Sequence, residues 1–230
     1  MFVGFFWQGL PPFVISWAQD LLPGEVVAIE TGTFQGDTSA LLAKTFGGCT
    51  TIERSPALAA QAVQRFAGDP KVTVLEGSSR DRLLEALPDH SKSCFFWLDA
   101  HGMYDYMGSD SEENPLLYEL TSILECRASY PNVIAVDDAR GMGTQPGWPP
   151  LADVFRILNE FDYVGVIVDD TLVTAPAGLN PDFYALYKKS RTVEVSAVFH
   201  IWPNVLRAAQ LRSWSDTVVI KTSKLLGRRR

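Results

Sequence analysis

The stretch VVAIETGTFQG, residues 26–36, decides the fold that we predict for this chain. It opens with four apolar residues, mostly β-branched, which is typical of a strand buried on both faces of a parallel sheet. The strand ends near Glu30, and a turn with Gly32 and Gly36 leads into a helical pattern that begins at Asp37. A strand, a glycine turn and a helix present backbone N–H groups and a helix N-terminus to a ligand. The stretch therefore predicts a nucleotide-type cofactor site, with an ordinary strand-to-helix turn as the alternative.

Short apolar runs alternate with helical patterns along the chain as far as Thr174. This alternation predicts an α/β fold with a doubly wound, mostly parallel sheet and helices on both faces. The runs 163–168 and 171–174 are expected to close the sheet as an antiparallel pair, with Asp169-Asp170 as their hairpin turn. We expect three regions: an apolar N-terminal extension or lid (1–24), a cofactor-binding core (25–175), and a C-terminal extension with a basic tail (176–230).

The composition is that of a globular protein in water, with 47% hydrophobic and 20% charged residues among 230. A chain of this length buries a large core within one elaborated domain. The net charge of −7 argues against general nucleic-acid binding. Three well-separated cysteines without a CxxC pair fit a reducing compartment, so we expect a cytoplasmic protein.

Both ends of the chain differ from its centre. The apolar segment 1–22 is interrupted by Pro11-Pro12 and has no basic start, so we expect neither a signal peptide nor a transmembrane helix. We expect a core-packing or lid segment there, with a membrane-surface or dimer contact as the alternative. The C-terminal part, for which we predict a helix at 204–212 and a strand at 217–222, ends in a basic tail. That tail is solvated or weakly attracted to anionic lipid or phosphate, and the oligomeric state stays open.

Acidic residues directly follow four of the predicted strands, at Glu30, Glu53, Asp99 and Asp137-Asp138. In an open α/β sheet, ligands bind outside the carboxyl ends of the strands. Glu53 follows the second strand, and its two carboxylate oxygens suit the two hydroxyls of a ribose, although a solvated strand end is the alternative. After the third strand, Gly77-Ser78-Ser79 marks either the place of an adenine edge or a helix N-cap.

The spacing of Glu30, Gly32 and Gly36 resembles motif I of the class I S-adenosylmethionine-dependent methyltransferases. The G-x-G-x-x-G pattern of dinucleotide-binding folds is incomplete here. The resemblance covers about residues 25–174 and implies the Rossmann-like methyltransferase fold, with S-adenosyl-L-methionine as cofactor. Phe34 departs from the pattern, since many members carry a small residue there.

By this resemblance, the glutamate and glycines of the motif line the methionine end of the cofactor, and Thr38 and Ser39 lie close to its carboxylate. Glu53 binds the ribose. The residues that we predict to bind the cofactor are Glu30, Thr31, Gly32, Thr33, Gly36, Thr38, Ser39, Glu53, Gly77, Ser78, Ser79 and Asp99.

The aspartates after the fourth and fifth strands predict a metal site. If these strands are neighbours, Asp99, Asp137 and Asp138 converge, and such carboxylates repel one another unless a cation neutralises them. A hard ion with oxygen ligands, such as Mg²⁺, suits them. The arrangement resembles the metal-dependent sugar O-methyltransferases of the macrocin O-methyltransferase type. That resemblance implies these three residues as metal ligands and Asp99 or His101 as the base that takes the hydroxyl proton. Without a metal, Asp99 is a plain strand-end acid and Asp138 a cap.

The function that we predict is O-methylation: transfer of a methyl group from S-adenosylmethionine to a hydroxyl of a small molecule or sugar, assisted by a divalent metal ion. Aromatic residues in the loop 103–113 and Trp148 are expected to cover the acceptor. The alternatives are a metal-independent methyltransferase with another acceptor, an NAD-type oxidoreductase, and a non-catalytic binding protein.

Overall fold

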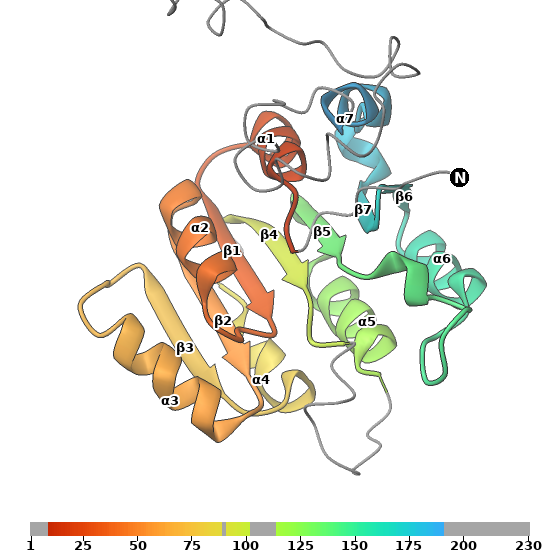
Figure 1. Cartoon of the computed structure of the whole chain (residues 1–230). Helices are drawn as coiled ribbons and strands as arrows, with labels where there is room; N and C mark the ends of the chain where they lie inside the picture. Colours follow the sequence, from red (N-terminus) through yellow and green to blue (C-terminus); the bar gives the residue numbers. More distant parts are fainter. Residues whose placement is uncertain (1–8, 89–90, 102–113, 191–230) are drawn as a thin grey trace, which may run out of the picture. The chain divides into compact units, whose positions relative to one another are not determined.

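The computed structural model describes residues 9–88, 91–101 and 114–190, and the chain divides into two units, Met1–Pro181 and Asp182–Arg230. The first unit holds a seven-stranded sheet with helices on both faces (Figure 1). The strands are β1 (Val26–Thr31), β2 (Cys49–Glu53), β3 (Val72–Glu76), β4 (Ser93–Leu98), β5 (Asn132–Val136), β6 (Tyr163–Val168) and β7 (Thr171–Pro176). The helices are α1 (Pro12–Leu21), α2 (Asp37–Thr45), α3 (Pro56–Arg65), α4 (Ser79–Ala86), α5 (Leu116–Arg127), α6 (Leu151–Glu160) and, in the second unit, α7 (Phe183–Ser190), with short 3-10 turns η1 (Ala139–Gly141) and η2 (Ala177–Leu179).

The strand order is β3-β2-β1-β4-β5-β7-β6, and β1 to β5 pair in parallel. Strand β7 runs antiparallel between β5 and β6. It does so because the turn Asp169-Asp170 folds the chain directly back, so that Val168 pairs with Thr171. The predicted doubly wound sheet with an antiparallel closing strand is confirmed. The order differs from the 3-2-1-4-5-6 order of dinucleotide-binding folds, which counts against the oxidoreductase alternative.

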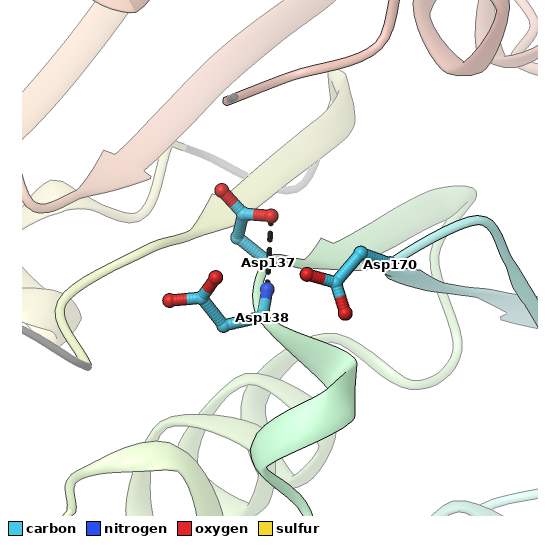
Figure 2. Close-up of side chains that lie close together, drawn as sticks. All are labelled: Asp137, Asp138 and Asp170. Atoms are coloured by element: carbon cyan, nitrogen blue, oxygen red, sulfur yellow. Dashed lines mark hydrogen bonds between the residues drawn. The ribbon is translucent and has the colours of Figure 1, made fainter. Parts of the chain in front are cut away.

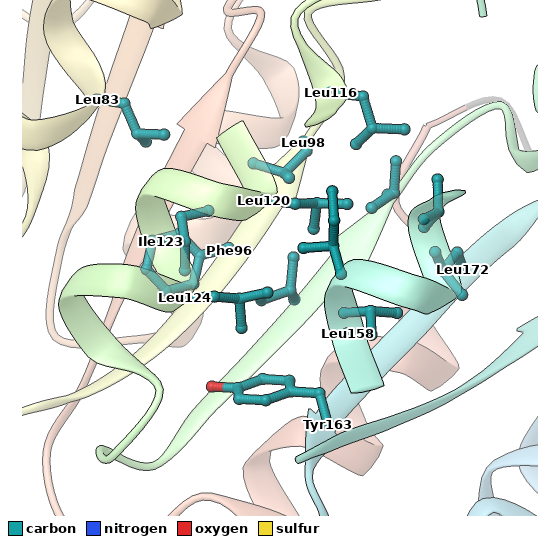
Figure 3. Close-up of a cluster of buried hydrophobic side chains, with 14 of the residues drawn as sticks. Leu83, Phe96, Leu98, Leu116, Leu120, Ile123, Leu124, Leu158, Tyr163 and Leu172 are labelled. Atoms are coloured by element: carbon teal, nitrogen blue, oxygen red, sulfur yellow. The ribbon is translucent and has the colours of Figure 1, made fainter. Parts of the chain in front are cut away.

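The core lies on both faces of the central strands, because β4 and β5 are buried along their whole length. Side chains alternate between the faces. Phe95 stacks on Phe46 at the end of α2, with ring centres 5.2 Å apart, whereas Phe96 and Leu98 join the apolar cluster under α4, α5 and α6 (Figure 3). Leu120 of α5 is wholly buried in this cluster, so Leu120→Ala is expected to cost about 2–5 kcal/mol. This packing fixes the strand ends that carry the acidic residues.

The proline pair near the N-terminus starts a helix. Pro12 is the first residue of α1, a position where a missing N–H costs nothing and the fixed φ suits the helix. The helix buries five of its side chains, among them Val14 and Trp17. Among the helices that the structure describes, none is long and apolar enough to cross a membrane. The helix and strand predicted at 204–212 and 217–222 lie outside the described residues.

Candidate cofactor site

The loop after β1 lies directly beside the end of β2. The N–H of Gly32 donates to the carbonyl of Ile52 over 2.9 Å, and the N–H of Phe34 donates to Oε2 of Glu53 over 2.9 Å. The other carboxylate oxygen of Glu53 accepts from the N–H of Ser55 over 2.8 Å. Each oxygen of an ionised carboxylate has a further acceptor site. The glycine loop and the acid predicted to bind ribose are therefore neighbours, and Glu53 can accept more hydrogen bonds.

Gly32 brings the loop against the end of β4. Its φ is +89°, and a Cβ built on it would lie 2.5 Å from the carbonyl oxygen of Asp99. Any other residue would both clash there and adopt a backbone conformation that L side chains disfavour. The contact places the glycine bend next to Asp99, where the order of the strands reverses and α/β proteins bind their ligands.

Phe34 holds a backbone conformation that normally belongs to glycine. Its φ is +48°, and 43% of its surface is exposed. A left-handed conformation costs a residue with a Cβ about 1–2 kcal/mol. Phe34 departs from the motif in sequence, but its backbone keeps the left-handed conformation that glycine would adopt. The loop is therefore strained at this position, as is common in functional loops.

Glu30 lies under the loop rather than at its surface. It is 1% exposed, and the hydroxyls of Ser39 and Thr51 donate to its Oε2. Burial raises the pKa of Glu30 to about 7, although these two hydrogen bonds lower it. The hydroxyl of Ser39, expected near the cofactor carboxylate, is thus engaged by Glu30. Thr33 is also engaged, because its hydroxyl lies 2.6 Å from that of Thr51.

The N-terminus of α2 carries no side-chain cap from any residue that the structure describes. Gly36, at φ +82°, is the N-cap residue, and Thr38 in the first turn is half-buried. A helix start without a cap leaves backbone N–H groups for an anion, such as a carboxylate. The first turn of α2 therefore stays a candidate site for the carboxylate of the cofactor.

The loop after β3 lies on the other side of Glu53. The N–H of Gly77 donates to the carbonyl of Glu53 over 2.9 Å. Ser78 is the N-cap of α4 and accepts from the N–H of Arg80, which was the alternative reading of this motif. Ser79 is buried against α5. Ser78 therefore serves the start of α4, the hydroxyl of Ser79 lies near Glu119 of α5, and contact with adenine stays a prediction for this loop.

Three carboxylates gather beyond the end of β5 (Figure 2). One oxygen from each of Asp137, Asp138 and Asp170 lies within 4.8 Å of the others. The Arg140 guanidinium pairs with Asp138 over 2.7 Å and also with Asp170, so a cation from the chain itself neutralises part of the group. The sequence predicts Asp99 as the third member of this group; the structure instead groups Asp170 with Asp137 and Asp138, while Asp99 lies near enough for both to raise its pKa. Asp170 belongs there because antiparallel β7 begins opposite the end of β5, a pairing that strand-end motifs do not reveal.

Asp99 and His101 both follow β4, and burial shifts their pKa values in opposite directions. Burial raises the pKa of Asp99 well above its ordinary value, and Asp137 and Asp138 raise it further. Burial instead lowers the pKa of His101 to about 3, so this imidazole is neutral at neutral pH. His101 packs against Trp148, with ring centres 4.8 Å apart and planes tilted by 57°. Neither ring nitrogen has a hydrogen-bond partner among the described residues.

A pocket of about 490 Å³ lies between the first turns of α4, α5 and α6, and Trp148 forms part of its wall. The indole also packs tightly on Gly141, where an added Cβ would lie 2.6 Å from it. The pocket thus shares a wall with the segment after Asp137-Asp138. Its lining residues are Arg80, Asn114, Leu117, Tyr118, Gly147, Trp148, Pro149, Pro150 and Asp153.

No protein-family model and no curated protein matches the chain. Among solved structures it is similar to an rRNA methylase from Streptococcus thermophilus, with 12% identity, a TM-score of 0.44, and coverage of 70% of this chain and 91% of that one. It is also similar to a geranyl diphosphate methyltransferase in complex with SAM (11%, 0.47, 71% and 82%). A third is the N-methyltransferase NodS from Bradyrhizobium japonicum WM9 (13%, 0.45, 70% and 89%). Similarities this distant do not establish an activity for this chain, and its fold rests on its own strand order.

Proposed function

We propose that this chain transfers a methyl group from S-adenosylmethionine to a hydroxyl of a small molecule or sugar. The observation that carries the proposal is the joint between β1 and β2, where the N–H of Gly32 donates to the carbonyl of Ile52 and the N–H of Phe34 donates to the carboxylate of Glu53. A ligand made of a nucleoside and an attached amino acid needs two things from the protein. An acidic side chain must bind the ribose hydroxyls, and a helix N-terminus must bind the ligand's own carboxylate. The chain places Glu53 and the start of α2 on the two sides of one loop.

The residues that the structure brings together suit methyl transfer. When bound, S-adenosylmethionine supplies an electrophilic methyl group on a positively charged sulfur. The carboxylate of Glu53, which accepts two backbone N–H bonds beside the glycine loop, favours such a cation nearby. Because in-line attack depends mainly on how the acceptor oxygen is held, positioning does most of the catalysis. Asp99, whose backbone touches Gly32, is the better-placed acceptor of the hydroxyl proton, since His101 is packed against Trp148.

The oxygen donors beyond β5 fit a hard divalent cation such as Mg²⁺. Burial and the neighbouring carboxylate of Asp138 raise the pKa of Asp137 to about 6, although the backbone N–H of Asp138 and the positive charge of Arg140 lower it. Asp137 and Asp138 would hold the ion, with Asp99 or Asp170 as the third ligand. An ion there would lower the pKa of an acceptor hydroxyl.

One observation favours a second candidate, a methyltransferase that needs no metal. Arg140 already pairs with Asp138 and Asp170, so the guanidinium takes the place that a metal would hold. In that case these acids fix the start of η1, where the N–H of Arg140 donates to Asp170. Activity that survives treatment with a chelator would decide for this candidate, and activity restored only by a divalent ion would decide for the first.

A ligand-dependent thermal shift tests the shared part of both candidates. Binding to the folded state alone raises the melting temperature. S-adenosylhomocysteine should raise that of the wild-type chain, whereas NADH should not. Gly32→Arg, which fills the bend beside Asp99, should remove the effect. A shift with NADH and none with S-adenosylhomocysteine would contradict the proposal.

A further inference from the structure

The last two residues of β1 point to opposite faces of the sheet, as neighbours in a strand do. Glu30 bonds to Ser39 of α2 on one face. Thr31 meets the carboxyl group of Glu119, from α5, on the other. The strand end that leads into the cofactor loop is therefore enclosed by two buried carboxyl groups. Glu30 belongs to the motif of the site already described, but Glu119 does not.

Glu119 is a buried acid without an adequate partner. Its side chain is 0% exposed, and neither carboxylate oxygen has a well-formed hydrogen bond among the described residues. The hydroxyls of Ser79 and Thr31 lie near enough to favour its charged form, and so does the positive charge of Arg80 at the start of α4. These are the groups of β1 and α4 that act on it. Burial outweighs them and raises the pKa of Glu119 to about 7.

The two hydroxyls beside Glu119 adjoin the two loops of the proposed cofactor site, since Thr31 ends β1 and Ser79 begins α4. Thr31 directly precedes Gly32, and Ser79 directly follows Gly77-Ser78. Thr31 Oγ1 and both carboxylate oxygens of Glu119 are buried without another hydrogen-bond partner in the described part of the chain, and the Thr31 hydroxyl lies near enough to the carboxyl to lower its pKa. One buried group on α5 thus reaches both loops from below the sheet edge.

We propose that Glu119 is a positioning residue, which acts through Thr31 and Ser79 to hold the two loops and sets the affinity for the cofactor by its charge state. The inference rests on the proposed function. Ionised Glu119 accepts hydrogen bonds from both hydroxyls at once, which fixes both loops. Protonated Glu119 must donate its own O–H, so one hydroxyl has to turn and accept. The ionised form therefore holds the site in its binding arrangement.

The experiment is a calorimetric titration of S-adenosylhomocysteine into the wild-type chain and into Glu119→Gln, from about pH 5.5 to about pH 8.5, a range that spans the titration of Glu119. S-adenosylhomocysteine has a neutral sulfur, so the charge of Glu119 cannot change its affinity through long-range attraction to a positive charge on the ligand. Glutamine keeps the shape but stays neutral. The ratio of the variant's Kd to that of the wild type should be near one at the acid end and rise to about tenfold at the alkaline end. Glu125→Gln, at an exposed position of the same helix, should give a ratio of one throughout.

A ratio for Glu119→Gln that is the same at every pH would show a merely structural role and overturn the inference, while the proposed function would stand. No heat from the wild type would contradict the proposed function and the inference together. If Glu119→Gln does not fold, Ser79→Ala replaces it. Loss of this hydroxyl should move the midpoint of the affinity step to higher pH, because Ser79 lowers the pKa of Glu119. An unmoved midpoint would also overturn the inference.

Discussion

The backbone N–H of Phe34 lies 2.9 Å from Oε2 of Glu53 and donates a hydrogen bond to it. The bond joins the loop after β1 to the acid that ends β2, nineteen positions further along the chain. A ligand that touches the glycine loop therefore meets Glu53 as well. This relationship gives the cofactor proposal its geometry, and the predictions below start from it.

Glu53→Ala should weaken the binding of S-adenosylhomocysteine by about 1.5–3 kcal/mol, the range for hydrogen bonds to a charged group. Calorimetry measures the change. Glu76→Ala is a matched control, because Glu76 pairs with Glu53 in the register of β2 and β3 and also ends its strand, yet its side chain is exposed. Equal affinities of the wild type and Glu53→Ala would place the ribose elsewhere.

At position 34, glycine should be more stabilising than alanine. Both variants lack the aromatic ring, but alanine keeps the strain of φ +48° and glycine does not. Phe34→Gly should exceed Phe34→Ala in free energy of unfolding by about 1 kcal/mol, measured by denaturant titration. At Gln35, whose φ is not positive, the order should reverse, since glycine there only adds freedom to the unfolded chain. The same order at both positions would mean that the loop has another conformation.

The buried carboxyl of Glu30 should make stability depend on pH. Its pKa is about 7 in the folded chain and 4.5 ordinarily. Between these values the unfolded chain releases the proton while the folded chain retains it, so the folded state loses stability as pH rises. The loss from Glu30 amounts to about 3 kcal/mol and is complete above pH 7. Below about pH 4.5 the residue is protonated in both states and contributes no such loss.

Glu30→Gln isolates this effect, because the other titrating groups cancel in the comparison with the wild type. The difference in free energy of unfolding between variant and wild type should shift in favour of the variant by about 3 kcal/mol from pH 4.5 to pH 7. Denaturant unfolding across this range measures it. A difference that does not change with pH would show that Glu30 is ionised in the folded chain throughout.

Removal of one carboxylate should abolish the binding of Mg²⁺ if the acids beyond β5 hold an ion. Asp138→Asn should eliminate the heat of Mg²⁺ binding while leaving the affinity for S-adenosylhomocysteine nearly intact. A comparison of Asp99→Asn with Asp170→Asn identifies the third ligand. Asp169→Asn is the control, since Asp169 is exposed and asparagine tolerates its φ of +54°. If the wild type binds no Mg²⁺, the metal proposal is wrong.

Local patterns in the sequence predicted the sheet and the neighbours of the glycine loop. Apolar runs that end in an acid place that acid at the carboxyl edge of a parallel sheet, whatever the details of packing. The position of Glu53 beside Gly32 follows from the adjacency of β1 and β2 alone. The proline pair predicted to interrupt the apolar segment 1–22 marks the start of α1, because proline suits the first position of a helix.

Other features of the site depend on pairings between distant segments, which a local pattern does not contain. Asp170 joins Asp137 only because β7 inserts between β5 and β6, and its turn motif predicts no more than a hairpin. Glu119 occupies an ordinary place in a helix, and its burial depends on how α5 lies under Thr31 and Ser79. Long-range packing, and not local propensity, brought both acids to the site.

The most direct test of the central claim is a calorimetric titration of S-adenosylhomocysteine into the wild-type chain at neutral pH. The joint between the glycine loop and Glu53 predicts binding with one site per chain and a Kd in the micromolar range or below. Absence of heat at millimolar ligand, from protein that is shown to be folded, would contradict it.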